Sequence, residues 1–225
     1  MNMTPAVPAQ TFAATHAGPH SRVGPMRAML QQATSEIHET MHRLPGFVRV
    51  AAGTSTKDEY FLLLRRLLGF HGPLERALRA ADSAVADGRY RKIPCGRARE
   101  KSSLLRADLT DLGATSPDIV STPLCKALPA VTSGDEIMGC LYVIEGAALG
   151  GKQIARALDG MLGAHTVAAR RFFLGRPDPD PLPWAVFCRL LESHAANGDP
   201  AAIAASARRT FESMSEWLHA DGKDV

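Results

Sequence analysis

Apolar side chains recur at intervals of three and four residues along most of the chain, which is the spacing of one face of an amphipathic helix. In the first such stretch the apolar positions run from Met26 to Met41, and the helix is expected to end near Leu44-Pro45-Gly46. A second runs from Tyr60 to Leu78, and its period continues through Pro73, which predicts a kink rather than a stop. Both stretches predict helices that bury one side against a core.

Local start signals predict further helices. Thr56-Lys57-Asp58-Glu59 and Ser133-Gly134-Asp135-Glu136 have the capping-box pattern, in which a hydroxyl and a carboxylate three residues apart bond each other's backbone amides. Ser116-Pro117, Asp180-Pro181 and Asp199-Pro200 place a capping residue before a proline, which is typical of a helix N-terminus. The capping-box helices therefore begin near Thr56 and Ser133.

The fold class follows from the remaining pattern. Leu104–Leu112 and Ile137–Leu162 are further helical stretches, and neither strand alternation nor a hairpin dipeptide nor an internal repeat is apparent. We therefore predict an all-α, single-domain, multi-helical bundle of about eight helices over residues 25–220. Residues 1–24 contain few large apolar side chains, so they are expected to form a mobile tail.

Composition narrows the functional classes. The chain has 225 residues, of which 45% are hydrophobic and 22% charged, and its net charge is +3 with the signs interspersed. This charge pattern does not favour binding of nucleic acid, and no apolar run is long enough to span a membrane. The four cysteines, Cys95, Cys125, Cys140 and Cys188, form no CxxC pair, so we expect a reducing, cytoplasmic compartment.

A first candidate site is His38-Glu39-Thr40-Met41-His42, which matches the HExxH pattern of zinc hydrolases. Two imidazoles one helical turn apart bind zinc, and the glutamate between them acts as a general base. Catalytic zinc also needs a third protein ligand, and no downstream motif supplies one. The zinc hydrolase is therefore the less favoured alternative, and His42 alone is typical of a surface histidine near a helix C-terminus.

A second candidate site combines His38 with the glycines of a later helix. His38 lies beside the apolar stripe of its helix, whereas Gly146, Gly150 and Gly151 interrupt a strongly helical segment. Each such glycine costs about 0.8–1 kcal/mol relative to alanine. Gly146 and Gly150 share one face, so they indicate either a close helix crossing or a platform for a flat ligand. A planar cofactor between the imidazole and bare backbone would explain both features.

These features follow one another in the same order as in the heme oxygenases. From Leu30 to Trp217 the chain resembles that family, specifically its bacterial biliverdin-producing branch. The matching strings are Met29–His38, Tyr60–Leu68 with Pro73-Leu74-Glu75, Arg97 to Gly113, Tyr142–Gly151, and Ala207–Phe211 with Trp217. The resemblance implies that His38, rather than His42, is the axial iron ligand. The second ring nitrogen of such a ligand bonds a carbonyl or carboxylate, and Glu36 and Glu39 are nearby in sequence.

The resemblance also implies that Gly146, Gly150 and Gly151 form the wall on the other side of the heme. The implied reaction converts heme, dioxygen and electrons into biliverdin, carbon monoxide and ferrous iron, with heme as both substrate and cofactor. Animal members carry an aspartate that organises proton-delivering waters where this chain has Ala147. Protons are then expected from waters held by backbone or by an arginine or tyrosine.

Partners follow from the same resemblance. The heme propionates need cationic partners, for which Arg27 and Arg189 are the candidates. Lys152 and Arg156 are candidates for facing the electron donor, a ferredoxin or a flavoprotein reductase. The alternative from the binding class is a non-catalytic relative that carries or senses heme or another tetrapyrrole, and Ala147 is its best support.

Overall fold

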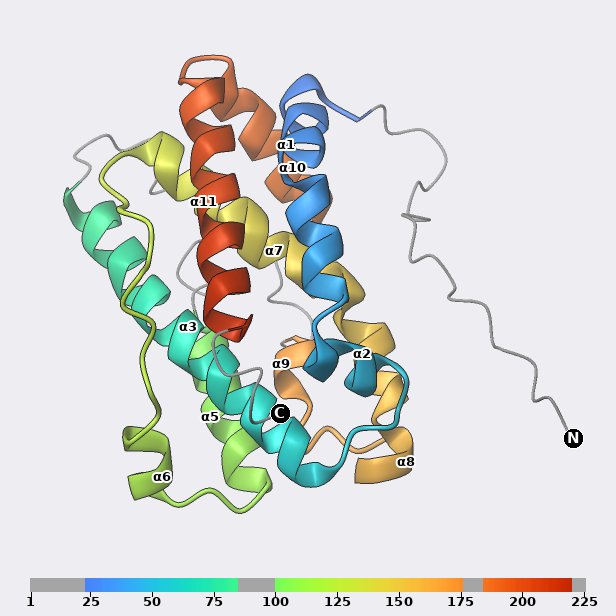
Figure 1. The fold of residues 1–225 in the computed structure, drawn as a ribbon. Helices are drawn as coiled ribbons and strands as arrows, with labels where there is room; N and C mark the ends of the chain where they lie inside the picture. Colours follow the sequence, from blue (N-terminus) through green and yellow to red (C-terminus); the bar gives the residue numbers. More distant parts are fainter. Residues whose placement is uncertain (1–22, 85–99, 176–183, 220–225) are drawn as a thin grey trace, which may run out of the picture.

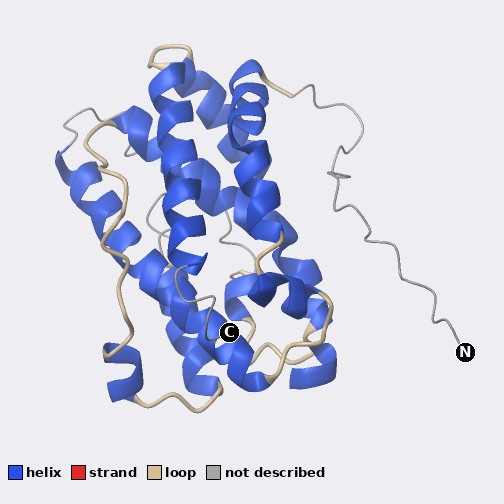
Figure 2. Cartoon of the chain, viewed as in Figure 1, coloured by secondary structure: helices blue, strands red, loops and turns tan. Residues whose placement is uncertain are grey.

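The structure is a computed structural model and describes residues 23–84, 100–175 and 184–219. These residues form helices and no strand, which confirms the predicted all-α class (Figure 2). The longer helices are α1 (Pro25–His42), α3 (Lys57–Ala84), α5 (Lys101–Asp111), α7 (Gly134–Ala157), α10 (Trp184–Ala195) and α11 (Pro200–His219). The shorter ones are α2 (Pro45–Ala51), α6 (Ser116–Val120), α8 (Asp159–Leu162) and α9 (Arg171–Leu174). None of the described helices has the length and apolar character needed to cross a membrane.

The predicted helix starts are present as hydrogen bonds. The Thr56 amide donates to the Glu59 carboxylate at 2.9 Å, and the Glu59 amide donates to the Thr56 hydroxyl at 3.2 Å. Ser133 and Glu136 make the same reciprocal pair at the start of α7. The Asp199 carboxylate accepts from the first free amides of α11. Local side-chain chemistry thus determines where α3, α7 and α11 begin.

Two helix limits differ from the predicted ones. Thr115, one residue before Ser116, caps α6, because its hydroxyl and the Asp118 carboxylate form the capping box. The helix expected to reach Leu162 divides, so that α7 ends at Ala157 and the one-turn helix α8 follows.

Arg170 explains this division. Its buried guanidinium donates to the Ala155 carbonyl at 2.7 Å and pairs with Asp159 at 2.5 Å, so it occupies the carbonyl end of α7. One-turn helices of this kind raise the number of helices to ten among the described residues, against the predicted eight or so.

Some predictions fall on parts of the chain that are not described. Residues 1–22 of the expected tail lie outside the described residues. The same is true of Cys95, Arg97 and the Asp180-Pro181 helix start.

Helix α7 is the centre of the bundle and contacts α2, α3, α8, α9, α10 and α11 (Figure 1). Its first half packs into one core with α1, α10, α11 and the second half of α3. Its second half packs into another core with α5, α9 and the first half of α3. The fully buried side chains of the two cores include Leu30, Phe70, Ile137, Phe187, Ile203, Tyr60, Leu64, Leu105 and Leu109. Residues between the two halves of α7 therefore lie at the junction of two cores.

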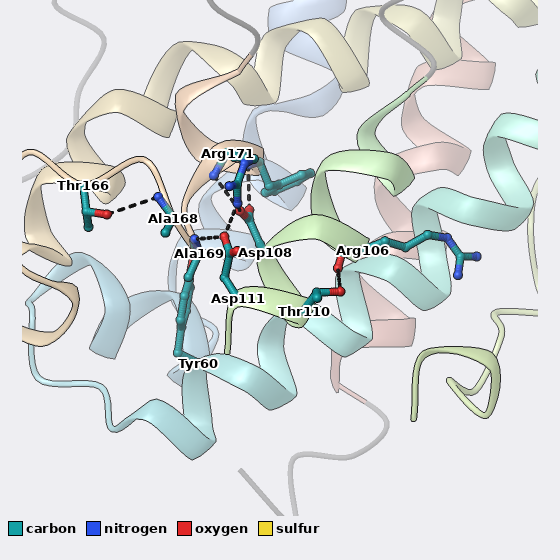
Figure 3. A network of polar contacts seen from close by, with 10 residues as sticks. Tyr60, Arg106, Asp108, Thr110, Asp111, Thr166, Ala168, Ala169 and Arg171 are labelled. Atoms are coloured by element: carbon teal, nitrogen blue, oxygen red, sulfur yellow. Dashed lines mark hydrogen bonds and ion pairs between the residues drawn. The ribbon is translucent and has the colours of Figure 1, made fainter. Parts of the chain in front are cut away.

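A polar network anchors the short helix α9 (Figure 3). The buried Asp108 carboxylate of α5 accepts from the backbone amides of Arg171 and Phe172, each at 2.8 Å. Tyr60 of α3 donates its phenol to the Ala169 carbonyl at 2.7 Å. These bonds cap the N-terminus of α9 from another helix and hold it against α7.

Candidate functional site

His38 is exposed on the last turns of α1. Its Nε2 lies 3.3 Å from Nε2 of His42, and its ring meets the Phe211 ring edge-on at 5.9 Å between centroids. Burial by the surrounding protein lowers the pKa of His38, and the neighbouring His42 lowers it further. The imidazole is therefore neutral at neutral pH, which is the form that binds a metal.

The glycines of α7 divide into two groups. A Cβ atom at Gly151 would collide with the Phe173 carbonyl of α9, and one at Gly139 would collide with the backbone of α11. A Cβ at Gly150 would meet nothing within 4 Å, and one at Gly146 would lie 3.7 Å from the Trp184 ring. Close helix packing accounts for Gly139 and Gly151, whereas no neighbouring backbone requires Gly146 or Gly150 to be glycine.

Helices α1 and α7 meet through Thr34 and Tyr142. The Thr34 side chain is 3% exposed, donates to the Leu30 carbonyl at 2.7 Å, and lies beside the Tyr142 phenol. Burial is the main reason that the pKa of Tyr142 is raised. His38 follows Thr34 by one helical turn, and Gly146 follows Tyr142 by one turn, so both extend from this contact along their own helices.

The next turn of α7 is unlike the rest of the helix. Residues 137–144 and Gly151 are buried, but all four residues of Ala147–Gly150 are exposed, and Leu149 is 44% exposed. Four consecutive helical residues cover all sides of the helix. The continuous helix α7 therefore has one exposed turn of small and apolar residues just past Gly146, where the two cores join.

Arg27 and Trp184 lie against the same part of α7. The Arg27 guanidinium lies 5.7 Å from the Trp184 ring centroid, and that ring contacts both Tyr142 and Gly146. Arg27 Nε and Trp184 Nε1 are both buried and have no hydrogen-bond partner. Each of these two buried N–H groups is therefore available to donate a hydrogen bond to an anionic oxygen of a ligand.

The other predicted cationic residues lie elsewhere on the surface. Arg189 is exposed on α10, between the buried residues Phe187 and Leu191. Lys152 and Arg156 are exposed on α7. The junction around Gly146 thus includes Arg27, whereas Arg189 lies on an exposed face of α10.

No carboxylate occupies the position of Ala147, which is exposed. The residue directly before Gly146 is Glu145, whose Oε1 is buried without a hydrogen-bond partner. The sequence interpretation did not consider Glu145, although an acid within an apolar helical run was visible in the sequence.

The described residues offer no third metal ligand for the zinc hydrolase alternative. His38 and His42 are close together, but no group of three or more His, Cys, Asp or Glu side chains that could hold a metal ion occurs within residues 23–84, 100–175 and 184–219. The described residues therefore do not provide the ligand set of a catalytic zinc site.

Fold and site together define an all-α protein in which a neutral histidine on one helix and bare glycine backbone on another extend from a single helix contact. Residues 25–220 match the model of the family described as heme oxygenase, so the chain belongs to the heme oxygenase family. A comparison with curated proteins finds no significant match.

The described residues fit heme. The unpartnered Nε atoms of Arg27 and Trp184 are suited to a propionate, and the exposed apolar turn past Gly146 is suited to a flat macrocycle. Trp184 was missed as a site residue by the sequence interpretation. An aromatic residue after a proline-rich segment of sequence gave no signal that it would contact the glycine face of another helix.

Proposed function

We propose that this protein cleaves heme oxidatively to biliverdin, carbon monoxide and ferrous iron, using dioxygen and electrons from an external ferredoxin or flavoprotein reductase. The Thr34–Tyr142 contact supports the proposal best, because it joins the two helices on which His38 and Gly146 follow one turn later. When bound, the heme iron would supply the oxygen chemistry, and the protein would supply binding, orientation and protons.

Each residue has a definite task in this proposal. His38 is the iron ligand, and its neutral imidazole suits both oxidation states of iron. Gly146, Gly150 and Ala147 form the opposite wall, where the absence of long side chains leaves room for dioxygen beside the ring. Gly151 supports that wall by letting α9 pack closely on α7.

The polar groups orient the macrocycle. Arg27 Nε and Trp184 Nε1 would each donate to a propionate oxygen, which would fix the rotation of the ring in its plane. Arg189 is the second candidate for a propionate. Lys152 and Arg156 offer exposed positive charge for docking of the electron donor.

The proposal places the protein in the cytoplasm. Cys125, Cys140 and Cys188 are free thiols, and two of them are buried, which suits a reducing compartment.

The decisive experiment is an anaerobic titration with hemin, followed by admission of oxygen together with a reductant. We expect the spectrum of a histidine-bound ferric heme, then a green bilin and carbon monoxide. The chain has two tryptophans, of which Trp184 is the one in contact with Gly146, so hemin should quench mainly its fluorescence. Absence of hemin binding would refute the proposal.

A second function is favoured by one observation. Because Ala147 provides no acid at its position, the protein could bind heme or another tetrapyrrole as a carrier or sensor without turnover. The same experiment separates the two functions. Tight hemin binding without bilin under oxygen and reductant would support the carrier or sensor.

A further inference from the structure

A group of ionisable side chains is buried between α3, α5 and α7. Glu75 and His71 of α3 are 1% and 4% exposed, and Lys101 of α5 and Glu145 of α7 are partly buried. None of them contributes to the heme contacts described above. Buried charges are costly unless they are paired, so this group needs an explanation.

Glu75 is satisfied by Ser102 of α5. The Ser102 amide donates to Glu75 Oε1 at 2.8 Å, and the Ser102 hydroxyl donates to Oε2. Hydrogen bonds of this kind favour the ionised carboxylate. The Arg79 charge acts on Glu75 in the same direction.

Glu145 has no such support. Its Oε1 is buried and accepts no hydrogen bond, and Lys101 is the charged group that attracts it. Lys101 also acts on Glu75. Glu75 therefore has the Arg79 charge and the Ser102 hydrogen bonds besides Lys101, whereas Lys101 is the cation that acts on Glu145.

Burial and hydrogen bonding distinguish the ionisable side chains of this group. His71 is neutral, because burial and the nearby Lys101 lower its pKa to about 3. A buried carboxylate is unfavourable unless it is paired and hydrogen-bonded, and Glu145 Oε1 accepts no hydrogen bond. Burial raises the pKa of both carboxyl groups and lowers that of Lys101. Since Ser102 stabilises the Glu75 carboxylate and Glu145 Oε1 has no hydrogen-bond donor, Glu145 is the carboxyl group whose protonated form is favoured.

Glu145 lies next to the glycine face of α7, where a proton donor is needed. Glu145 directly precedes Gly146, and successive residues of a helix are rotated by about 100°. Glu145 therefore lies on one flank of the glycine face, and Ala147 lies on the other. Reduction of dioxygen consumes protons, and Ala147 has none to give.

We propose that Glu145 is the proton donor to the face of α7 formed by Gly146 and Gly150, and that Lys101 returns the proton to it. The Glu145 O–H bond breaks as its proton moves to the reduced oxygen, which leaves a carboxylate opposite the Lys101 ammonium. Lys101 Nζ then gives a proton to Glu145 and takes one from solvent. This inference rests on the proposed heme-cleaving function.

The protonation state can be tested without heme. Infrared spectra of the hemin-free protein at neutral pH should contain the C=O stretch of a protonated carboxylic acid, and Glu145→Gln should remove it. Glu212→Gln is the matched control, because Glu212 is paired with Arg208 on the surface of α11 and should contribute no such band. Persistence of the band in Glu145→Gln, or its absence from the unaltered protein, would overturn the inference.

The role in turnover is tested on the hemin-loaded protein. With oxygen and reductant, Glu145→Gln should slow bilin formation at least about tenfold, with hemin affinity unchanged, and Glu145→Asp should restore part of the rate. Hydrogen peroxide carries its own protons, so with peroxide the Gln variant should match the unaltered protein. Equal slowing with both oxidants, or no slowing with oxygen, would refute proton donation. A protein that binds no hemin would instead refute the proposed function, while the infrared result would stand.

Discussion

Thr34 of α1 lies beside the phenol of Tyr142 of α7, between the two helices that carry the two halves of the proposed site. Four residues later, the first helix presents His38 and the second presents Gly146. Four residues advance a helix by about 6 Å, so each group lies about one turn beyond the contact on its own helix. A contact between two helix surfaces thereby fixes where an imidazole and bare backbone extend.

Removing the phenol hydroxyl tests this contact. Tyr142→Phe keeps the ring that packs 5.7 Å from Trp184 but loses the largely buried hydroxyl that lies beside Thr34. We expect the free energy of unfolding to fall by about 1 kcal/mol, measured by urea denaturation. Thr40→Val is the control, because the Thr40 hydroxyl bonds only within α1, to the Glu36 carbonyl at 3.0 Å. An equal loss in both variants would show that the contact between the helices contributes nothing specific.

Replacement of either histidine distinguishes the iron ligand. His38→Ala should abolish the absorption spectrum of histidine-bound ferric heme, because the neutral imidazole that α1 presents is gone. His42→Ala, one turn further along the same helix, should retain that spectrum. Both measurements are hemin titrations followed by absorption. An unchanged spectrum in His38→Ala, or its loss only in His42→Ala, would transfer the ligand role to His42.

Much of the fold could be predicted from local chemistry. Thr56 and Ser133 cap the helices that their capping boxes predicted, because the bonds involved are made within four residues. Helix α9 was not predicted, since its N-terminal amides are capped by Asp108, more than sixty residues away in the chain. An element held by a distant carboxylate leaves no local signature.

The site was predictable only in outline. The glycine positions in α7 were evident from the sequence, but a helical glycine serves a close crossing and a ligand wall equally well. Gly151 packs against the Phe173 carbonyl, while Gly150 is open, and only tertiary packing separates them. The role of Gly151 as a direct heme contact stays a prediction, as do those of Gly146 and Gly150.

His71 makes stability depend on pH. Its pKa is lowered from 6.5 to about 3 in the folded protein, so the unfolded chain binds a proton in a range where the folded chain does not. The stability is therefore present above pH 6.5 and is lost as the pH falls towards 3. At about 1.4 kcal/mol per pH unit, lowering the pH from 6.5 to 5 should cost about 2 kcal/mol through this residue.

The measurement compares the unaltered protein with His71→Phe. Both are unfolded with urea at pH 7, 6 and 5, and the variant should lose less stability over this range, whatever its stability at pH 7. Phe is chosen because His71 already lies among rings, 5.3 Å from Phe172 and 5.8 Å from Phe70. Parallel pH dependence in the two proteins would mean that His71 is not the buried neutral group described here.

Adding one methyl group at each of two adjacent glycines separates packing from binding. At Gly151 the methyl group would collide with the Phe173 carbonyl, so Gly151→Ala should destabilise the free protein by about 1–3 kcal/mol. At Gly150 nothing lies within 4 Å, so Gly150→Ala should stabilise the free protein by up to about 1 kcal/mol, the helix-propensity difference.

The methyl group added at Gly150 would project towards the macrocycle, so Gly150→Ala should bind hemin more weakly and form less bilin. A variant that is more stable yet poorer at binding is the signature of a glycine kept for a ligand. If Gly150→Ala binds and turns over hemin as before, the heme does not lie against this face of α7.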